Sequence, residues 1–324
     1  MLSYDKLVEG IFLVKSDDKN PWKCNGILIK NEANSGNILI DCNFKKKEYI
    51  QLFNDFGDHI DAYIATHAHL DHANNLQYFE KLKPEVEKLC PIPENEYLMN
   101  IDLFIRDNGA LDFGIGESLK AVLLGIVRFK ELKSVTGFPT GKEFNFEKIK
   151  IKTIPTTGHS PGHFAMIIEN PSRKILFASD IGLDNFGPWY GFKYNSLKEI
   201  RSDVKKIEEI YLNGDYILAS SHGEIFFDKQ PDIFKEVLSK VDRNEKRLLK
   251  LFENNPNTPK GLRDLTLKGV IYSPKTIAKW STLGDNMDNL IHFWEGYFVL
   301  NHISELVERG ILREVEDEKW ILNQ

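Results

Sequence analysis

The sequence predicts a mixed α/β protein with two or more layers built around β-sheet, followed by a smaller helical unit. Up to about residue 230, short apolar runs bounded by turn residues alternate with stretches of helical periodicity. Beyond that point the pattern is mainly helical. A chain of 324 residues fits one large domain or two. We therefore expect a main domain over residues 1–230 and a second domain over residues 231–324.

Apolar runs between turn-forming residues predict the strands of the main domain, and apolar spacing of three to four residues predicts its helices. The run Ile60–Ala65 is typical of a buried strand, and it leads directly into a cluster of histidines. Residues 83–107 have no clear period. Strands are expected at residues 10–15, 26–30, 36–41, 60–65, 148–154, 164–168, 174–178 and 216–220, and helices at 45–56, 71–82, 117–132 and 195–211.

The C-terminal region combines helices with a final hairpin. Residues 232–254 have helical spacing with a break, residues 297–309 form an amphipathic helix ended by Gly310, and residues 311–322 have the pattern of a hairpin. This order predicts a winged-helix-like module. The alternative is a helical cap that packs on the main domain or at a homodimer interface. Acidic and basic residues balance here, which argues against a DNA-binding wing.

Composition, charge and cysteine content favour a folded protein of the cytoplasm. The formal net charge is -6 and no long basic run occurs, so extended contact with nucleic acid is not expected. The odd set of three cysteines, Cys24, Cys42 and Cys90, does not predict a disulfide framework and suits a reducing compartment. No apolar run approaches the roughly 20 residues of a membrane span.

The strongest chemical signal is the segment Thr66–His72. Three of the nine histidines, His67, His69 and His72, lie in it together with Asp71. The segment comes directly after an apolar run and before a helical pattern, so its side chains can turn toward a common point. Neutral imidazole and carboxylate groups are the ligands that zinc and similar metals prefer. A polar loop with histidines by chance is the alternative, and such clustering argues against it.

Further candidate ligands follow other expected strands, since one short loop seldom completes two coordination shells. His159 lies in Thr157–His163, where glycines let the backbone approach a metal closely. Asp180 follows an apolar run that ends at Ala178, and His222 follows another that ends at Ala219. Each of these residues alone is more typical of a turn or loop. As an ordered set after the first cluster, they predict a metal site.

These segments resemble the metallo-β-lactamase superfamily. Its five motifs appear in order as Asp41, the His67–His72 run, His159, Asp180 and His222. The resemblance covers roughly the first 230 residues and implies an αββα sandwich, with the metals at one edge of the two sheets. It implies that His67, His69 and His159 bind one metal, that Asp71, His72 and His222 bind a second, and that Asp180 bridges them. Asp41 would orient the ligand loop, and His163 would not be a ligand.

The C-terminal pattern is similar to the winged-helix appendage of one subgroup of these hydrolases. Residues 83–107 depart from the family, because they lack the short strand and helix expected after the second motif. The aromatic segment Phe186–Phe192 follows Asp180 and is expected to line the substrate cleft. Tyr190 is a candidate donor to an oxyanion there. The alternative is that the rings only pack the loop.

The resemblance implies an enzyme with two zinc ions, in which a metal-bound hydroxide attacks a small ester, thioester, lactone or amide. Asp71 would pass a proton to the leaving group. Iron or manganese would accept the same ligands, although His69 stands where diiron members usually have glutamate. Other hypotheses are a phosphodiesterase or ribonuclease of the same fold, a mononuclear iron persulfide dioxygenase, and a metal-dependent sensor. The expected partner is a small-molecule substrate, and neither membrane nor nucleic acid.

Overall fold

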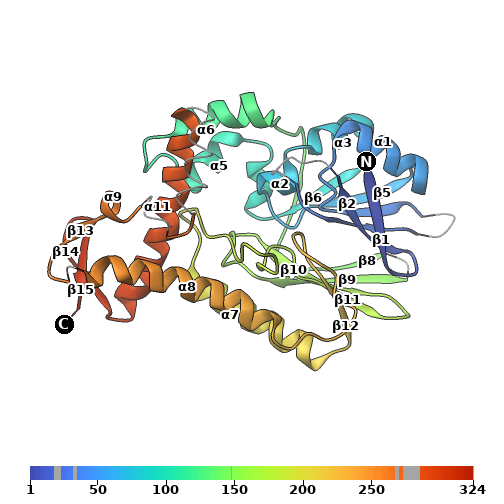
Figure 1. Ribbon diagram of the computed structural model, residues 1–324. Coiled ribbons are helices and arrows are strands. Elements are labelled where there is room, and N and C mark those ends of the chain that lie inside the picture. Colours follow the sequence, from blue (N-terminus) through green and yellow to red (C-terminus); the bar gives the residue numbers. More distant parts are fainter. Residues whose placement is uncertain are drawn as a thin grey trace.

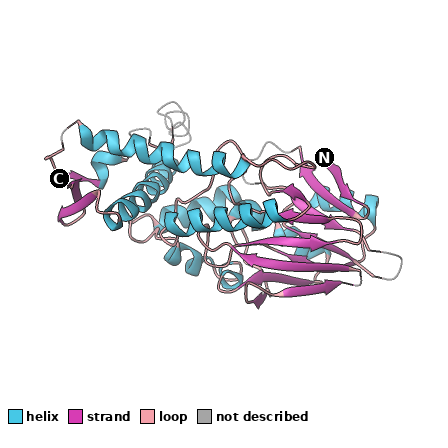
Figure 2. Cartoon of the chain, turned by 90° about the horizontal axis from the view of Figure 1, so that it is seen from below, coloured by secondary structure: helices cyan, strands magenta, loops and turns pink. Residues whose placement is uncertain are grey.

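The computed structural model describes residues 1–17, 23–31, 35–146, 148–254, 256–266, 270–272 and 285–323. Two β-sheets lie face to face, with helices on their outer sides (Figure 1). The first sheet has seven strands in chain order and the second has five, in the order β12-β11-β10-β9-β8. Figure 2 shows the strands of the two large sheets at one end of the molecule, and helices with a few short strands at the end where the C-terminus lies. The predicted αββα sandwich is confirmed.

The strand bounds follow the apolar runs of the sequence. Most neighbouring strands are antiparallel, but β4, β5, β6 and β7 run parallel, and so do β11 and β12. The strands of the sandwich are β1 (Leu2–Val8), β2 (Ile11–Ser16), β3 (Gly26–Ile29), β4 (Asn37–Ile40), β5 (Ile60–Ile64), β6 (Glu87–Pro91), β7 (Thr136–Phe138), β8 (Glu143–Phe146), β9 (Ile149–Pro155), β10 (Phe164–Glu169), β11 (Lys174–Phe177) and β12 (Tyr216–Ala219).

Side chains of each strand alternate between two apolar cores. On β3, Ile27 and Ile29 point between the sheets, whereas Leu28 points to the outer helices. On β4, Leu39 likewise points outward while its two isoleucine neighbours point inward. This is the two-residue period of a strand, here with both faces buried. Apolar runs without polar alternation are therefore what these central strands require.

The helices lie outside the sheets and in the C-terminal part of the chain. Those before residue 130 are α1 (Lys46–Phe56), α2 (Leu70–Ala73), α3 (Leu76–Leu82), α4 (Glu94–Tyr97), α5 (Ile101–Asp107), α6 (Gly116–Ala121) and the π-helical turn η1 (Val122–Val127). The later helices are α7 (Leu197–Asn213), α8 (Ile233–Glu253), α9 (Leu262–Leu265) and α11 (Asp285–Glu308). None of the described helices is long and apolar enough to cross a membrane.

Several sequence predictions need correction. Residues 83–107 do contain a strand and helices, namely β6, α4 and α5. The helix expected at 71–82 is interrupted, because the Asn43 amide donates to the carbonyl of Asp71 and to Asn74 Oδ1, both at 2.7 Å. The helix expected at 117–132 ends at Arg128, which adopts a left-handed φ of 61°. The predicted break in α8 is absent, since Ile233–Glu253 is one continuous helix.

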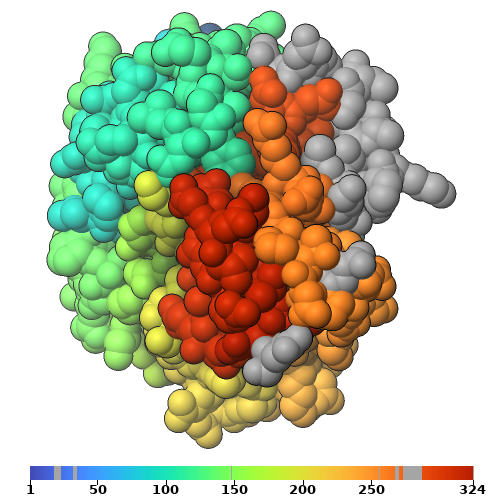
Figure 3. Space-filling model, turned by 90° about the vertical axis from the view of Figure 1, so that its left-hand side faces the viewer, coloured from blue at the N-terminus to red at the C-terminus, as the bar shows by residue number. Residues whose placement is uncertain are grey.

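The C-terminal helix α11 is longer than predicted and is shared by two apolar cores. Its first half, which includes Phe293 and Phe298, packs in the core outside the sheets. Its second half, which includes Ile303 and Leu306, packs in a separate cluster with α8 and Trp320. The strands β13 (Lys260–Gly261), β14 (Leu312–Glu316) and β15 (Lys319–Leu322) form a small sheet beside it. Figure 3 shows this end of the molecule, with the red C-terminal segment between orange and green segments. The boundary at residue 230 stays a prediction.

A buried polar chain joins α11 to the loop before α7. The Asn244 amide donates to Tyr190 Oη at 3.0 Å, and the tyrosine hydroxyl is also hydrogen-bonded to His302 Nε2 at 3.0 Å. Burial lowers the pKa of His302 to about 3, with the nearby Arg201 and Arg309 adding to the effect. His302 is therefore neutral in the folded protein.

We expect acid to destabilise the protein through His302. Between about pH 6.5 and 3 the unfolded chain binds a proton on this side chain that the folded chain does not, so stability falls as the pH falls below 6.5. Between pH 7.5 and pH 5, the free energy of unfolding of the wild type should fall by about 2 kcal/mol more than that of the His302→Asn variant. Urea titrations at both pH values would measure this, and equal losses in the two proteins would contradict it.

Candidate metal centre

All the predicted ligands lie at one edge of the sandwich, just beyond the ends of strands. The His67–His72 segment follows β5, His159 follows β9, Asp180 follows β11 and His222 follows β12. The parallel pair β11 and β12 ends at one sheet edge, as does the parallel pair β4 and β5 on the facing sheet. Strand ends of two packed sheets thus bring together residues far apart in sequence.

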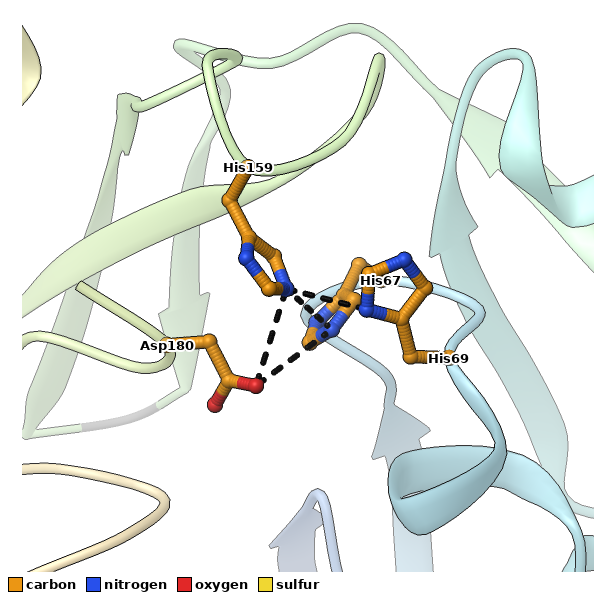
Figure 4. Close-up of side chains that lie close together, drawn as sticks. All are labelled: His67, His69, His159 and Asp180. Atoms are coloured by element: carbon orange, nitrogen blue, oxygen red, sulfur yellow. Dashed lines mark hydrogen bonds and ion pairs between the residues drawn. The ribbon is translucent and has the colours of Figure 1, made fainter. Parts of the chain in front are cut away.

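One group consists of His67, His69, His159 and Asp180, whose ligand atoms lie within 4.8 Å of one another (Figure 4). His159 Nε2 is 3.2 Å from His67 Nε2 and 2.9 Å from His69 Nδ1. Asp180 Oδ2 is 3.6 Å from His159 Nε2. Three ring nitrogens and one carboxylate oxygen therefore point at a common centre, as in a tetrahedral metal site.

A second group consists of Asp71, His72, Asp180 and His222. His222 Nε2 is 2.8 Å from Asp71 Oδ2 and 3.6 Å from Asp180 Oδ2. His72 Nε2 is 3.3 Å from Asp180 Oδ1. Burial alone would lower the pKa of His222, but the carboxylates of Asp180 and Asp71 outweigh it and raise the pKa to about 9. This excess of negative charge favours a cation, and Asp180 belongs to both groups.

The protonation pattern of the first group fits a metal ion. Burial, with the neighbouring histidines, holds the pKa of His67 and His159 well below the ordinary value. Burial also lowers the pKa of His69 to about 3. The Nδ1 of His159 lies 3.2 Å from the carbonyl oxygen of Trp189, which can only accept, so the proton is there and Nε2 carries a lone pair. Neutral imidazoles whose nitrogens converge are the form that binds a metal.

Two buried polar atoms of the second group support the same interpretation. His72 Nε2 and Asp180 Oδ1 are buried, and neither makes a hydrogen bond of acceptable geometry. A buried polar group without a hydrogen bond costs free energy. A cation between them would satisfy both atoms. The donor set of nitrogen and oxygen atoms in the two groups therefore fits divalent metal.

Asp41 is hydrogen-bonded to the ligand loop, in line with the role that the family resemblance implies for it. Its carboxylate accepts from Thr66 N at 2.8 Å and from Thr66 Oγ1 at 2.6 Å, and it lies 2.9 Å from His72 Nδ1. A proton on Nδ1 leaves His72 Nε2 free to face the second group. Asp41 also adopts a left-handed φ of 49°, which is uncommon for a residue other than glycine and is typical of functional sites.

His163 positions the backbone of Asp180 through hydrogen bonds of its ring. Its Nδ1 donates to the carbonyl oxygen of Thr156 at 2.9 Å, and its Nε2 accepts from the backbone N–H of Asp180 at 3.1 Å. Both ring nitrogens are thus engaged by protein groups. The ring links the β9 loop to the β11 loop and fixes the backbone that carries Asp180.

Glu94 is a site residue that sequence reasoning missed. It is only 1% exposed, and its carboxylate joins the two histidine loops. Oε2 accepts from Ala68 N at 2.6 Å, while Oε1 accepts from Ser160 Oγ at 2.6 Å and from Gly162 N at 2.7 Å. Burial raises its pKa, although these hydrogen bonds oppose the shift. Glu94 begins α4, in the stretch that has no clear period, so no pattern pointed to it.

A cavity of about 310 Å³ opens beside both groups. Phe186, Trp189 and Phe192 line it, as predicted for the aromatic segment. The prediction for Tyr190 is wrong: its ring is buried and its hydroxyl is bonded to His302 and Asn244, away from the cavity. The residues that line the cavity are His69, Leu70, Asp71, Phe104, Leu119, His159, Ser179, Asp180, Gly182, Leu183, Asp184, Phe186, Gly187, Trp189, Phe192, His222 and Trp294.

Known proteins share this fold. A metallo-beta-lactamase family protein from Thermus thermophilus is 16% identical over 98% of this chain and 100% of its own, with a TM-score of 0.68. A beta-lactamase domain protein from Burkholderia ambifaria is 15% identical over 98% of this chain and 94% of its own, with a TM-score of 0.70. Both alignments include the C-terminal helices. Residues 20–222 match the family model of the metallo-beta-lactamase superfamily. The chain therefore belongs to that superfamily.

Proposed function

We propose that this protein is a dinuclear zinc hydrolase of a small ester, thioester, lactone or amide. The observation that carries the proposal is the pair of ligand groups that share Asp180. Membership of the superfamily and the His/Asp groups support a metal-dependent hydrolase in general. The nitrogen and oxygen donors favour zinc, while iron and manganese accept the same set.

In this proposal each group holds one ion. His67, His69 and His159 hold the first. Asp71, His72 and His222 hold the second, and Asp180 lies between the two. When bound, such ions lower the pKa of a water molecule toward about 7 and polarise a carbonyl oxygen. Asp41, His163 and Glu94 fix the loops so that the ligand atoms converge.

Asp71 is the proposed catalytic residue. Its side chain is 21% exposed and lines the cavity, so a substrate can reach it. The reaction adds water across the bond between the acyl carbon and the leaving atom. A carbon–oxygen bond forms, the bond to the sulfur, oxygen or nitrogen of the leaving group breaks, and that atom takes a proton. The Asp71 carboxylate is placed to hold this proton in transit.

The other functions have less support. A phosphodiesterase or ribonuclease that acts on nucleic acid would need basic side chains for the phosphates that flank the scissile one, and no lysine or arginine is among the described residues that line the cavity. A mononuclear iron dioxygenase would leave the Asp71, His72 and His222 group without a role. The three cysteines are free and buried, which supports the proposed cytoplasmic location.

Elemental analysis of protein purified without added metal tests the proposal. We expect about two zinc ions per chain, falling to about one in His222→Ala, because only the second group loses a ligand. The same preparations should hydrolyse acyl thioesters or esters, and chelation should abolish the activity. One iron ion per chain, unaffected by His222→Ala, would overturn the proposal in favour of the dioxygenase. Cleavage of bis-p-nitrophenyl phosphate alone would overturn the substrate assignment.

A further inference from the structure

We propose that the cavity beside the metal groups is a binding site for an uncharged, hydrophobic acyl group, and that helix α11 sets its depth. This rests on the proposed function, which it extends from a reaction type to a substrate class. The shared chemistry is an acyl chain on an electrophilic carbonyl. Thioesters, oxyesters and lactones present it alike.

Aromatic rings form a continuous wall from the metal groups to α11. The His69 ring lies 5.2 Å from Phe192, and the Phe192 ring lies 5.9 Å from Trp189. Trp189 in turn meets Trp294 of α11 at 5.7 Å and a near-perpendicular 78°. On another side Phe104 lies 5.9 Å from Phe192. A chain attached to a carbonyl at the metal groups would therefore run along apolar surface, which favours hydrocarbon over polar groups.

The part of the cavity beyond the metal groups offers no partner for an anionic acyl group. Outside the ligands of the two groups, Asp184 is the ionisable side chain of the described lining, which holds no lysine or arginine. Asp184 lies outside both metal-ligand groups, and its Oδ1 accepts from the backbone N–H of Gly187 at 2.8 Å. With the carbonyl at the metal groups, a carboxylate at the far end of the acyl chain would be buried against aromatic rings and would have no cation in the described lining there to pair it, at a cost in binding free energy.

The C-terminal helix completes the cavity. Trp294 is 7% exposed and projects from α11, which the neighbouring Phe293 and Phe298 anchor in the apolar core. Leu119 of α6 lies in the same lining, and α6 contacts α11. At about 310 Å³ the cavity is near the lower end of the range for ligand pockets, roughly 300–1,000 Å³, so it fits an acyl chain of a few carbons. The size of the side chain at position 294 should then determine the longest acyl chain that the cavity accommodates.

Neutral methyl ketones, which cannot be hydrolysed, probe this site directly. We expect calorimetry on the zinc-loaded protein to show about fourfold tighter binding for each added methylene from 2-pentanone to 2-heptanone. The anion 6-oxoheptanoate has the same number of carbons as 2-heptanone and should bind at least about tenfold more weakly. A repeat after chelation separates binding in the cavity from coordination to metal. Equal affinity for the two seven-carbon ketones, or no binding, would overturn the proposal.

Variants of α11 test the depth of the site. In Trp294→Ala, affinity for 2-nonanone relative to 2-pentanone should rise at least about fivefold, because the far wall is removed. Val299→Ala is the matched control: this buried side chain lies on the same helix but packs in the separate cluster with α8 and Trp320 and does not line the cavity, so the ratio should not change. Trp294→Phe, with a smaller loss of volume, should be intermediate. An unchanged ratio in folded Trp294→Ala would overturn the role of α11.

Acyl thioesters of N-acetylcysteamine separate this inference from the proposed function. If chain-length preference in hydrolysis follows that of ketone binding, both stand. Ketone binding without hydrolysis of any thioester or ester would overturn the proposed hydrolase function but support the acyl-binding site. Hydrolysis that ignores chain length and accepts a succinyl group as readily as a butanoyl group would sink the inference and leave the hydrolase.

Discussion

Asp180→Ala is expected to lower the hydrolytic rate by at least about a thousandfold and to reduce the metal content of both sites. Asp180 is the one residue common to the two ligand groups, with Oδ1 facing His72 and Oδ2 facing His159 and His222. Its loss would remove one proposed ligand from each ion, although Asp71 would still lie beside His222 and Asp41 beside His72. Metal ions contribute several kcal/mol to transition-state stabilisation, which corresponds to this loss of rate.

Asp184→Ala is the matched control for that variant. Asp184 lies in the same loop and lines the same cavity, but it belongs to neither ligand group. We expect it to retain both metals. Elemental analysis and turnover of a thioester would be measured side by side for the two variants. Asp180→Ala protein that kept its full metal content and wild-type turnover would refute the bridging role.

Glu94→Gln is the second change with a large expected effect, although Glu94 touches no metal. The amide would turn an NH2 group toward one of the donors that the carboxylate now accepts, Ala68 N on one side or Ser160 Oγ and Gly162 N on the other. A buried donor left without an acceptor costs about 1–3 kcal/mol. Since one of the two histidine loops would lose its hydrogen bond to residue 94 and shift relative to the other, we expect metal affinity to fall about 10- to 100-fold.

The measurement is metal dissociation by competition with a chelator, together with thermal unfolding of the metal-free protein. Glu96→Gln serves as the control, because Glu96 lies on the same short helix but is exposed. It should behave as the wild type. A Glu94→Gln variant that unfolds at a lower temperature but binds metal normally would mean that Glu94 stabilises the fold only.

The ligand residues could be predicted because the chemistry and the topology agree. His67, His69 and His72 stand together in the sequence, and His159, Asp180 and His222 each follow an apolar run that proved to be a strand. Residues that directly follow strands lie at the edge of the sheet. A position just after a predicted strand therefore indicated where each of these residues lies in the fold. Their role as ligands stays a proposal until metal is measured.

The residues that support the site left no comparable signal. Glu94 acts through backbone N–H groups, which every residue has, so no partner could be recognised in the sequence. The prediction for Tyr190 failed for a different reason. Successive rings of an aromatic loop can point to opposite sides, and only the packing around the loop determines which ring faces the cavity. Trp189 faces the cavity, whereas Tyr190 turns to His302, a residue more than a hundred positions away.

The fold was predictable where local pattern was strong. Strands β3 and β4 are almost purely aliphatic, and the glycine expected to end the last helix, Gly310, does adopt a left-handed φ of 69°. The first strand, Leu2–Val8, was missed because only Leu2 and Leu7 of it are buried, five positions apart, and the charged and polar residues between them leave no two-residue period. The extent of α11 was missed because it is buried by two different cores, which leaves no single polar face.

The contact between Trp189 and Trp294 constrains how this protein can be re-engineered. A chimera that exchanges residues 231–324 for those of a relative would replace one ring of the pair and keep the other. The side chains at positions 189 and 294 would then no longer pack together. The chimera would lose the shape of the cavity at this contact, and with it the acyl-chain selectivity that the exchange was meant to transfer. A functional chimera should therefore exchange the segment Phe186–Phe192 together with the C-terminal helix, because the two pack against each other.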